Sequence, residues 1–112
     1  MSTDSVSVKG HITIKLNDQT WDFENFFTIA GRNGLADQIL STPTLSKPSH
    51  MALGTGIPTS TALGAELNRV ALSSKTRFTN VVSMVGDWAP GVGTGALTEA
   101  GIFDGVFPGN MW

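Results

Sequence analysis

The sequence predicts a mainly β fold, an antiparallel β-sandwich with two short helices in its connections. The first observation is the alternation of apolar and polar residues over 6–16, which is the period of a half-buried strand. The second is the spacing of glycine, proline and other turn-forming residues, which divides the chain into short segments. The third is the composition. Of 112 residues, 40% are hydrophobic and 14% are charged, which excludes a disordered chain and indicates one domain over 1–112.

The first predicted element is a β-hairpin at the N-terminal end. Apolar residues occupy the even positions of 6–16 except Gly10, and mostly polar residues occupy the odd positions. The tetrapeptide NDQT at 17–20 is a turn signal, and Trp21 and Phe23 then resume the alternation. We expect one face of this hairpin to pack on a core.

The first helix is predicted over 30–40. Leu35 and Ile39 lie four residues apart, which places them on one helical face, and Thr28 is the expected N-cap. A loop is predicted to follow over 41–49, because its two prolines fit neither a helix interior nor a central strand.

A second short helix is predicted over 61–69, because Leu63 and Leu67 share a helical face. The other segments of the C-terminal half have the composition of strands, separated by glycine-rich loops. In chain order they are a short buried strand at 50–53, a strand-like stretch at 70–78, a turn at 79–80, a strand with two apolar faces at 81–88, a strand at 96–104, and the opening of a further strand at 111–112.

The sequence predicts no catalytic, cofactor-binding or metal-binding residue. The glycine-rich segments 54–56 and 91–95 lack both the Gly-Lys-Ser/Thr of a P-loop and the G-x-G-x-x-G of a dinucleotide-binding turn. There is no cysteine and no Gly-x-Ser-x-Gly elbow, and His11 and His50 are far apart in the sequence. A net charge of −2 disfavours nucleic acid and anionic membranes as partners. No apolar run approaches the length of a membrane helix.

Three carboxylates beside apolar residues are the main candidates for a functional site: Glu66, Glu99 and Asp104. Paired carboxylates can act as general acid and base. In the structural alternative, Glu66 pairs with Arg69 or with a backbone group. Glu99 or Asp104 then accepts hydrogen bonds from backbone N–H groups where strands turn. Small domains often hold their loops with buried carboxylates, so we predict the structural role.

Four short motifs follow one another in the chain: AGRNGLA at 30–36, HMALGTG at 50–56, TALGAELNR at 61–69 and GALTEAGIFD at 95–104. In this order they resemble a family of small tailed-bacteriophage virion proteins, in which ALGTG and TEAGIFD are recurrent motifs. Members are tail-fibre, collar or other structural proteins, so the resemblance implies a virion component and not an enzyme. The motif residues to which it implies a structural role are Arg32, Gly54, Gly56, Glu66, Arg69, Glu99, Gly101, Phe103 and Asp104.

The resemblance also implies an assembly, with the chain made in the cytoplasm of a host bacterium and located in the virion. We expect a homo-oligomer, such as a ring or a trimer, that packs against other virion proteins of the tail, collar or fibre. The composition points the same way, because few charges and many Gly, Thr and Ser residues leave little on the surface to keep monomers apart. Neither a cofactor, nor nucleic acid, nor a membrane is expected as a partner.

Two alternative functions remain open at this point. One is a decoration, or cement, protein bound to the phage head, and the other is a receptor- or glycan-binding module at a fibre tip. The family continues past its last motif with another apolar strand, whereas this sequence stops at Met111 and Trp112. We therefore expect either a longer natural chain or a strand completed by a neighbouring subunit.

Overall fold

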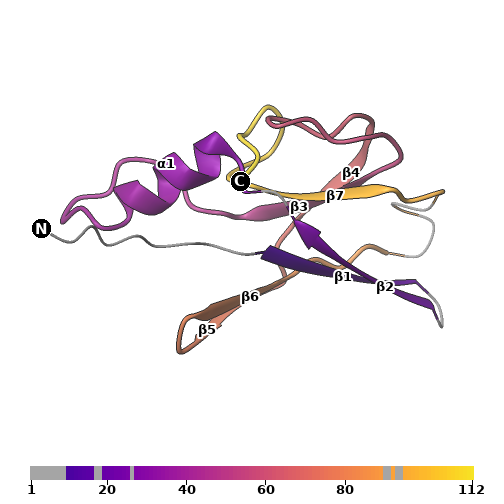
Figure 1. The fold of residues 1–112 in the computed structure, drawn as a ribbon, viewed down its shortest axis with the longest axis horizontal. Helices are drawn as coiled ribbons and strands as arrows, with labels where there is room; N and C mark the ends of the chain where they lie inside the picture. The colour runs from indigo at the N-terminus through magenta and orange to yellow at the C-terminus, as the bar shows by residue number, and fades with distance from the viewer. Residues whose placement is uncertain (1–9, 17–18, 26, 90–91, 93–94) are drawn as a thin grey trace, which may run out of the picture.

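A computed structural model of the chain describes residues 10–16, 19–25, 27–89, 92 and 95–112. Every ladder between named strands is antiparallel, so the predicted mainly β fold is confirmed. Figure 1 shows the elements, which in chain order are β1 (Gly10–Leu16), β2 (Gln19–Asn25), α1 (Ile29–Asp37), β3 (His50–Gly54), β4 (Glu66–Ala71), β5 (Ser74–Phe78), β6 (Val81–Val85) and β7 (Glu99–Phe103).

The centre of the fold is a three-stranded sheet in the order β4-β3-β7. In the middle strand, Ala52 lies opposite Arg69 of β4 on one side and Gly101 of β7 on the other. Along β7, Glu99, Gly101 and Phe103 are buried, whereas the two residues between them are half-buried. This alternation is the strand period, and it directs one face of the sheet toward the core.

A β-bulge interrupts the ladder between β3 and β4. The register shifts by one residue between Leu53 and Gly54, which leaves Leu67 as the extra residue of β4. In a regular strand, residues three apart face opposite sides of the sheet. The extra residue brings Glu66 and Arg69 to the same side, where their side chains meet.

The prediction of a second helix over 61–69 is wrong. This segment is a loop that runs into β4, and α1 is the one helix among the residues that the structure describes. Leu63 is buried in the core, whereas Leu67 is 43% exposed, so the two side chains do not share a face. Two backbone N–H groups just before β4 donate to the carboxylate of Glu99, a distant partner that the local spacing does not reveal.

Two hairpins accompany the central sheet. The β1–β2 hairpin is the predicted N-terminal one, and its ladder pairs Gly10 with Asn25 through Leu16 with Gln19. Residues 6–9 of the predicted strand and 17–18 of the predicted turn lie outside the described residues. In Figure 1 both hairpins are drawn on the side of the sheet opposite the long loops that follow β3 and β7.

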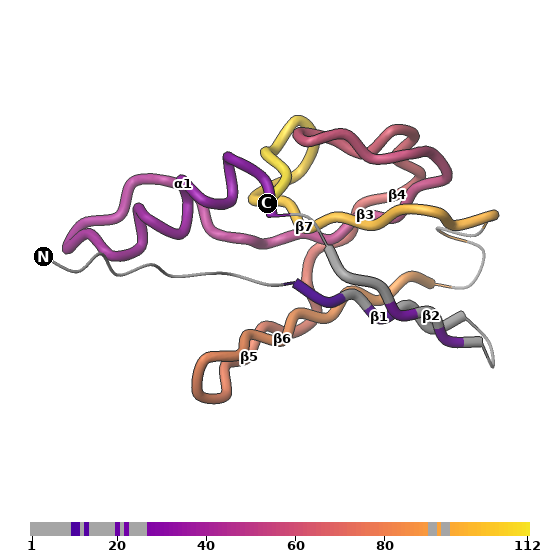
Figure 2. Tube along the Cα trace, viewed as in Figure 1, coloured from indigo at the N-terminus to yellow at the C-terminus, as the bar shows by residue number. Residues whose placement is uncertain are grey.

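The predicted strand at 70–78 exists, but it passes from one ladder to another. The N–H of Leu72 donates to Ser49 at 2.9 Å, beside β3, and the next N–H, of Ser73, donates to Val85 at 2.8 Å, in β6. Figure 2 shows the chain continuing from β4 into β5 at this point. The predicted turn at 79–80 joins β5 to β6. This change of partner sends the β5–β6 hairpin away from the sheet.

The N-cap of α1 confirms the sequence prediction and adds a long-range contact. The Thr28 hydroxyl accepts a hydrogen bond from the N–H of Gly31 at 2.9 Å, as an N-cap does. The same hydroxyl donates to the carbonyl of Met111, and the N–H of Thr28 donates to the carbonyl of Trp112 at 3.1 Å. Met111 also forms an antiparallel bridge with Phe103 of β7. The helix start is therefore held by residues far away in sequence.

The end of α1 is held by Asp37, which ties down the loop after the helix. Its carboxylate accepts hydrogen bonds from the N–H of Leu45 at 2.9 Å and from the N–H of Thr44 at 3.0 Å. The Leu45 N–H is the main reason that the pKa of Asp37 lies below its ordinary value, and the hydrogen bonds from Thr44 lower the pKa further. These bonds favour the ionised form.

Asp37→Asn is expected to lower the Tm at neutral pH, because the amide cannot accept all of these hydrogen bonds. A lowered pKa in the folded state contributes stability that is present above the ordinary value of 3.8 and is lost as the pH falls through the lowered value. The Tm difference between wild type and variant should therefore shrink in acid. Thermal unfolding of both chains from pH 7 to pH 2.5 measures this, and a difference that stays constant would contradict it.

Candidate functional site

Most of the predicted motif residues lie on one face of the central sheet, called here the motif face. The register places Gly54 between Glu66 of β4 and Glu99 of β7. Two residues along β3, Ala52 lies between Arg69 and Gly101. Because side chains two residues apart share a face, strand pairing alone brings the motifs together. The residues of the motif face are Ala52, Gly54, Glu66, Arg69, Glu99, Gly101 and Phe103.

Glu99 is the centre of the hydrogen bonding on this face. It is 2% exposed, and its carboxylate accepts hydrogen bonds from the N–H groups of Gly56 at 2.8 Å, Gly64 at 2.6 Å and Ala65 at 2.8 Å. These donors lie at the two ends of the loop between β3 and β4. A buried carboxylate that accepts charge-assisted bonds from several N–H groups fixes the path of such a loop.

The glycines of the second motif leave the space that Glu99 and the loop occupy. A Cβ on Gly54 would lie 2.6 Å from the carbonyl oxygen of Ala65, and a Cβ on Gly56 would lie 2.7 Å from the nitrogen of the same residue. Both distances are shorter than any tolerated contact, so these positions require glycine for the close approach of the loop. Thr98 closes the loop from the other side, since its N–H donates to Gly54 and its hydroxyl to Gly56.

Arg69 forms the second group of contacts on the motif face. Its guanidinium donates two hydrogen bonds to the carboxylate of Glu66, at 2.9 and 2.7 Å, and a third to the carbonyl of Gly105 at 3.0 Å. The guanidinium carbon lies 3.6 Å from the ring centroid of Phe103 and 5.9 Å from that of Phe107. The Arg69 side chain is 8% exposed, whereas that of its partner Glu66 is 25% exposed, so the ion pair lies at the edge of the buried region.

Asp104 closes the loop that follows β7. Its carboxylate accepts a hydrogen bond from the N–H of Asn110 at 2.8 Å, and its own N–H donates to the carbonyl of Asn110 at 3.0 Å. Together with the bond from Arg69 to Gly105, this positions the loop above Phe103. All three carboxylates therefore have the kind of structural contact that the sequence predicts. Glu66 pairs with Arg69, and Glu99 and Asp104 accept hydrogen bonds from backbone N–H groups.

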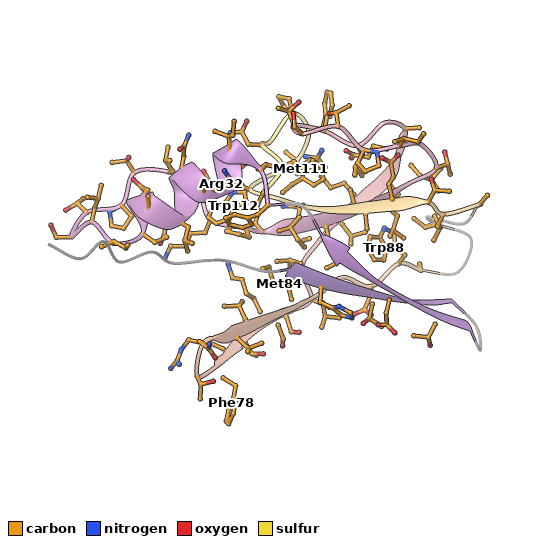
Figure 3. The ribbon with its side chains drawn as sticks, in the orientation of Figure 1. Arg32, Phe78, Met84, Trp88, Met111 and Trp112 are labelled. Atoms are coloured by element: carbon orange, nitrogen blue, oxygen red, sulfur yellow. The ribbon has the colours of Figure 1, made fainter. Side chains whose placement is uncertain are left out.

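The first motif does not join the motif face. Arg32 lies on α1 and is exposed, as Figure 3 shows. The histidines are also apart: the ring of His11 contacts Asp22 in the β1–β2 hairpin, and the ring of His50 contacts the hydroxyl of Ser49. Within the described part of the chain, no three His, Cys, Asp or Glu residues gather as metal ligands would.

Sequence reasoning missed three positions that the structure makes important. Gly64 packs its backbone against Ile57, where a Cβ would lie 2.7 Å from the nitrogen of Ile57. Asp37 carries no motif that marks it as a loop anchor. Gly34 lies under the ring of Trp112. For Gly34 the sequence offers one signal, because a glycine inside a helical pattern often marks a close packing contact.

Arg69→Ala is expected to destabilise the fold by about 2–3 kcal/mol, because it removes a bidentate ion pair and the cation over Phe103 and leaves a carbonyl without its donor. Arg69→Lys should recover only a minor part, since an ammonium cannot form the bidentate pair. Denaturant unfolding of the three chains measures the effect. Equal stability of the lysine variant and wild type would show that charge alone matters.

Comparisons with known proteins do not assign the chain to a family. No family model matches it, and neither a curated protein nor a solved structure does so. Within the described residues, no helix is both long and apolar enough to cross a bilayer. The function is therefore argued from the motifs and contacts of this chain.

Proposed function

We propose that the chain is a structural subunit of a tailed-phage virion. In this proposal it belongs to the tail, collar or fibre apparatus, assembles as a homo-oligomer and packs on other virion proteins. Its motif residues serve to shape the subunit, and none of them is catalytic. The four motifs support the proposal of a virion protein, and the exposed surface supports the proposal of an assembly.

The observation that carries the proposal is the exposed surface of the described residues. Every residue of β5 is exposed, and so is every residue of β6 except Met84. A two-stranded hairpin that packs on so little is marginally stable in water by itself. Such an element is typical of a subunit whose packing is completed by its neighbours.

The exposed surface is also strongly apolar. The buried apolar residues of the described chain are few: Ala52, Leu53, Leu63, Phe103 and Met111. Larger apolar side chains are exposed on α1 and the loop after it, on β4, on the β5–β6 hairpin, and on the loops that follow β3, β6 and β7. They are Ile29, Leu35, Ile39, Leu40, Leu45, Ile57, Leu67, Phe78, Val81, Val82, Val85, Val92, Val106 and Phe107. Extensive exposed apolar surface marks interaction sites.

The contacts on the motif face support reading the motifs as one unit. The fourth motif supplies Glu99, which binds backbone N–H groups of the second and third motifs. The third motif supplies Arg69, which stacks on Phe103 of the fourth. Motif residues that recur together in a family are expected to contact one another in this way, because the position of each loop then depends on side chains from the other motifs.

We further propose a sandwich-like arrangement as the finer description of the fold. Met51 of β3 points away from the motif face and packs on the far side of the sheet, where a Cβ on Gly86 would lie 3.1 Å from both Met51 and Trp88. Figure 3 shows Trp88 between the sheet and the β1–β2 hairpin. In this arrangement the two hairpins form a second layer beside the central sheet, as a sandwich requires.

Mass spectrometry of purified particles tests the proposed function. The phage whose genome encodes the chain is banded by density, and the copies of the chain per particle are counted against the major capsid protein. We expect several copies in a fixed ratio that survives repeated banding. A chain that is abundant in the lysate but missing from the banded particles would overturn the virion assignment.

A further inference from the structure

The outer edge of β6 is suited to pairing with a strand of another molecule. The β5–β6 hairpin is a two-stranded sheet, so among the described residues the outer edge of each strand pairs with no other strand. An isolated hairpin of this length is marginally stable in water. Figure 3 shows Phe78 at the end of the hairpin, pointing away from the molecule, and this side chain is 81% exposed. We propose that β6 pairs with β6 of a second copy of the chain across a two-fold axis.

The sequence of β6 is self-complementary for antiparallel pairing. The strand reads VVSMV, and it contains no charge, no proline and no glycine. If two copies pair about Ser83, Val81 lies opposite Val85 of the second copy, and Val82 lies opposite Met84 of the second copy. Each of these pairs is apolar, and the central pair is serine with serine. Apolar pairs directly opposite each other are the unit that stabilises an antiparallel sheet.

The outer edge of β5 does not have this property. The strand reads SKTRF, so pairing two copies about Thr76 places Lys75 of each copy opposite Arg77 of the other. Like charges directly opposite each other destabilise a sheet, and charged residues are a common device that protects an edge. Of the two free edges, β6 is therefore the one that a second copy can occupy.

A second copy fits this edge better than an unrelated partner because the pairing is symmetric. A two-fold contact uses the same patch on both subunits, and β6 matches itself residue by residue in its antiparallel register. The pairing yields a four-stranded sheet in the order β5-β6-β6-β5, whose outer edges both carry Lys75 and Arg77. Because those edges repel further copies, the contact closes after two subunits, either as a dimer or as a link between two rings.

This inference rests on the proposed function for its assembly role, but it is tested by itself. The chain has no cysteine, so Ser83→Cys introduces a single thiol. Opposite residues of an antiparallel pair have Cα atoms about 4.5–5.5 Å apart, within the range that a disulfide spans. Thr76→Cys is the matched control, because Thr76 lies opposite Ser83 within the hairpin and both residues are exposed. Its two copies would be roughly 14 Å apart across three strand spacings.

We expect Ser83→Cys to form a covalent dimer under mild oxidation at micromolar concentration and Thr76→Cys to remain mostly monomeric on a non-reducing gel. A mixture of Val81→Cys and Val85→Cys should cross-link to each other more than either does alone, which tests the register. Circular dichroism before oxidation shows that each variant is folded.

Equal cross-linking of the Ser83 and Thr76 variants, or none in either, would overturn the two-fold contact. So would a mixture of the Val81 and Val85 variants that links no better than each variant alone. These results leave the proposed function untouched, because the chain can still be present in banded particles. Conversely, a β6-linked dimer of a chain that is missing from the particles would keep the contact and overturn the virion assignment.

Discussion

Glu99→Gln is expected to destabilise the chain by about 3 kcal/mol, the largest effect of any single isosteric change on the motif face. The carboxylate accepts three backbone N–H bonds through its two oxygens. An amide retains one oxygen, so its NH₂ group must face at least one of these donors. The donors belong to the loop between β3 and β4, and a buried N–H without an acceptor costs about 1–3 kcal/mol. Denaturant unfolding measures the loss.

Glu66→Gln is the matched control for this experiment, because the same atoms are exchanged on the same face. Glu66 is partly exposed and accepts hydrogen bonds from one side chain, Arg69. Its loss is expected to cost about 1 kcal/mol or less, as for a solvent-accessible ion pair. If the two glutamine variants were equally stable, Glu99 would not be the residue that holds the loop.

Gly34→Ala is expected to destabilise the wild-type chain by about 2 kcal/mol, although alanine is normally the better helix former. A Cβ at position 34 would lie 2.6 Å from Cη2 and 2.9 Å from Cε2 of Trp112, too close to the indole ring for any tolerated contact. The ring would have to leave its position across α1, where it also meets Phe27 edge to face at 6.4 Å. The stability of this helix therefore depends on a residue at the other end of the chain.

The sign of this effect is expected to reverse when Trp112 is removed. In the Trp112→Ala background the space above Gly34 is empty, so Gly34→Ala should stabilise by about 0.5–1 kcal/mol through helix propensity. Thermal or denaturant unfolding of the four chains of this double-mutant cycle measures the coupling. A Gly34→Ala effect of the same sign in both backgrounds would show that Trp112 does not pack on the helix.

The parts of the fold that follow from local pattern could be predicted from the sequence. The N-terminal hairpin and the strand at 50–53 follow from alternation and turn residues, and the cap at Thr28 follows from its hydroxyl. The residue pattern of 70–78 predicts one strand-like element. The structure divides it between two ladders, because pairing partners come from elsewhere in the chain.

The parts that depend on distant contacts could not be predicted. The segment 61–69 has the leucine spacing of a helix, but Glu99 captures its backbone N–H groups and the chain enters β4 instead. For Glu66 the sequence leaves two structural partners open, Arg69 or a backbone group, and the structure shows the ion pair with Arg69. It forms in a strand, because the bulge at Leu67 turns both side chains to one face.

The candidate site was predictable to the extent that its residues carry motifs. The apolar neighbours of Glu66, Glu99 and Asp104 mark these carboxylates in the sequence, and in the structure each of them accepts hydrogen bonds. Arg32 belongs to the first motif, which lies apart from these carboxylates on α1. The role of Trp112 depends on the glycines of a helix far from it in sequence, so composition and spacing contain no sign of it.

Immunogold labelling of intact particles tests the central claim most directly. An antibody against the recombinant chain is applied to purified particles of the phage that encodes it, and the label is located by electron microscopy. We predict label on the tail, the collar or the fibres. Label over the head would make the chain a decoration protein. Particles that stay bare both intact and after disruption would contradict the account, because the chain would then not be part of the virion.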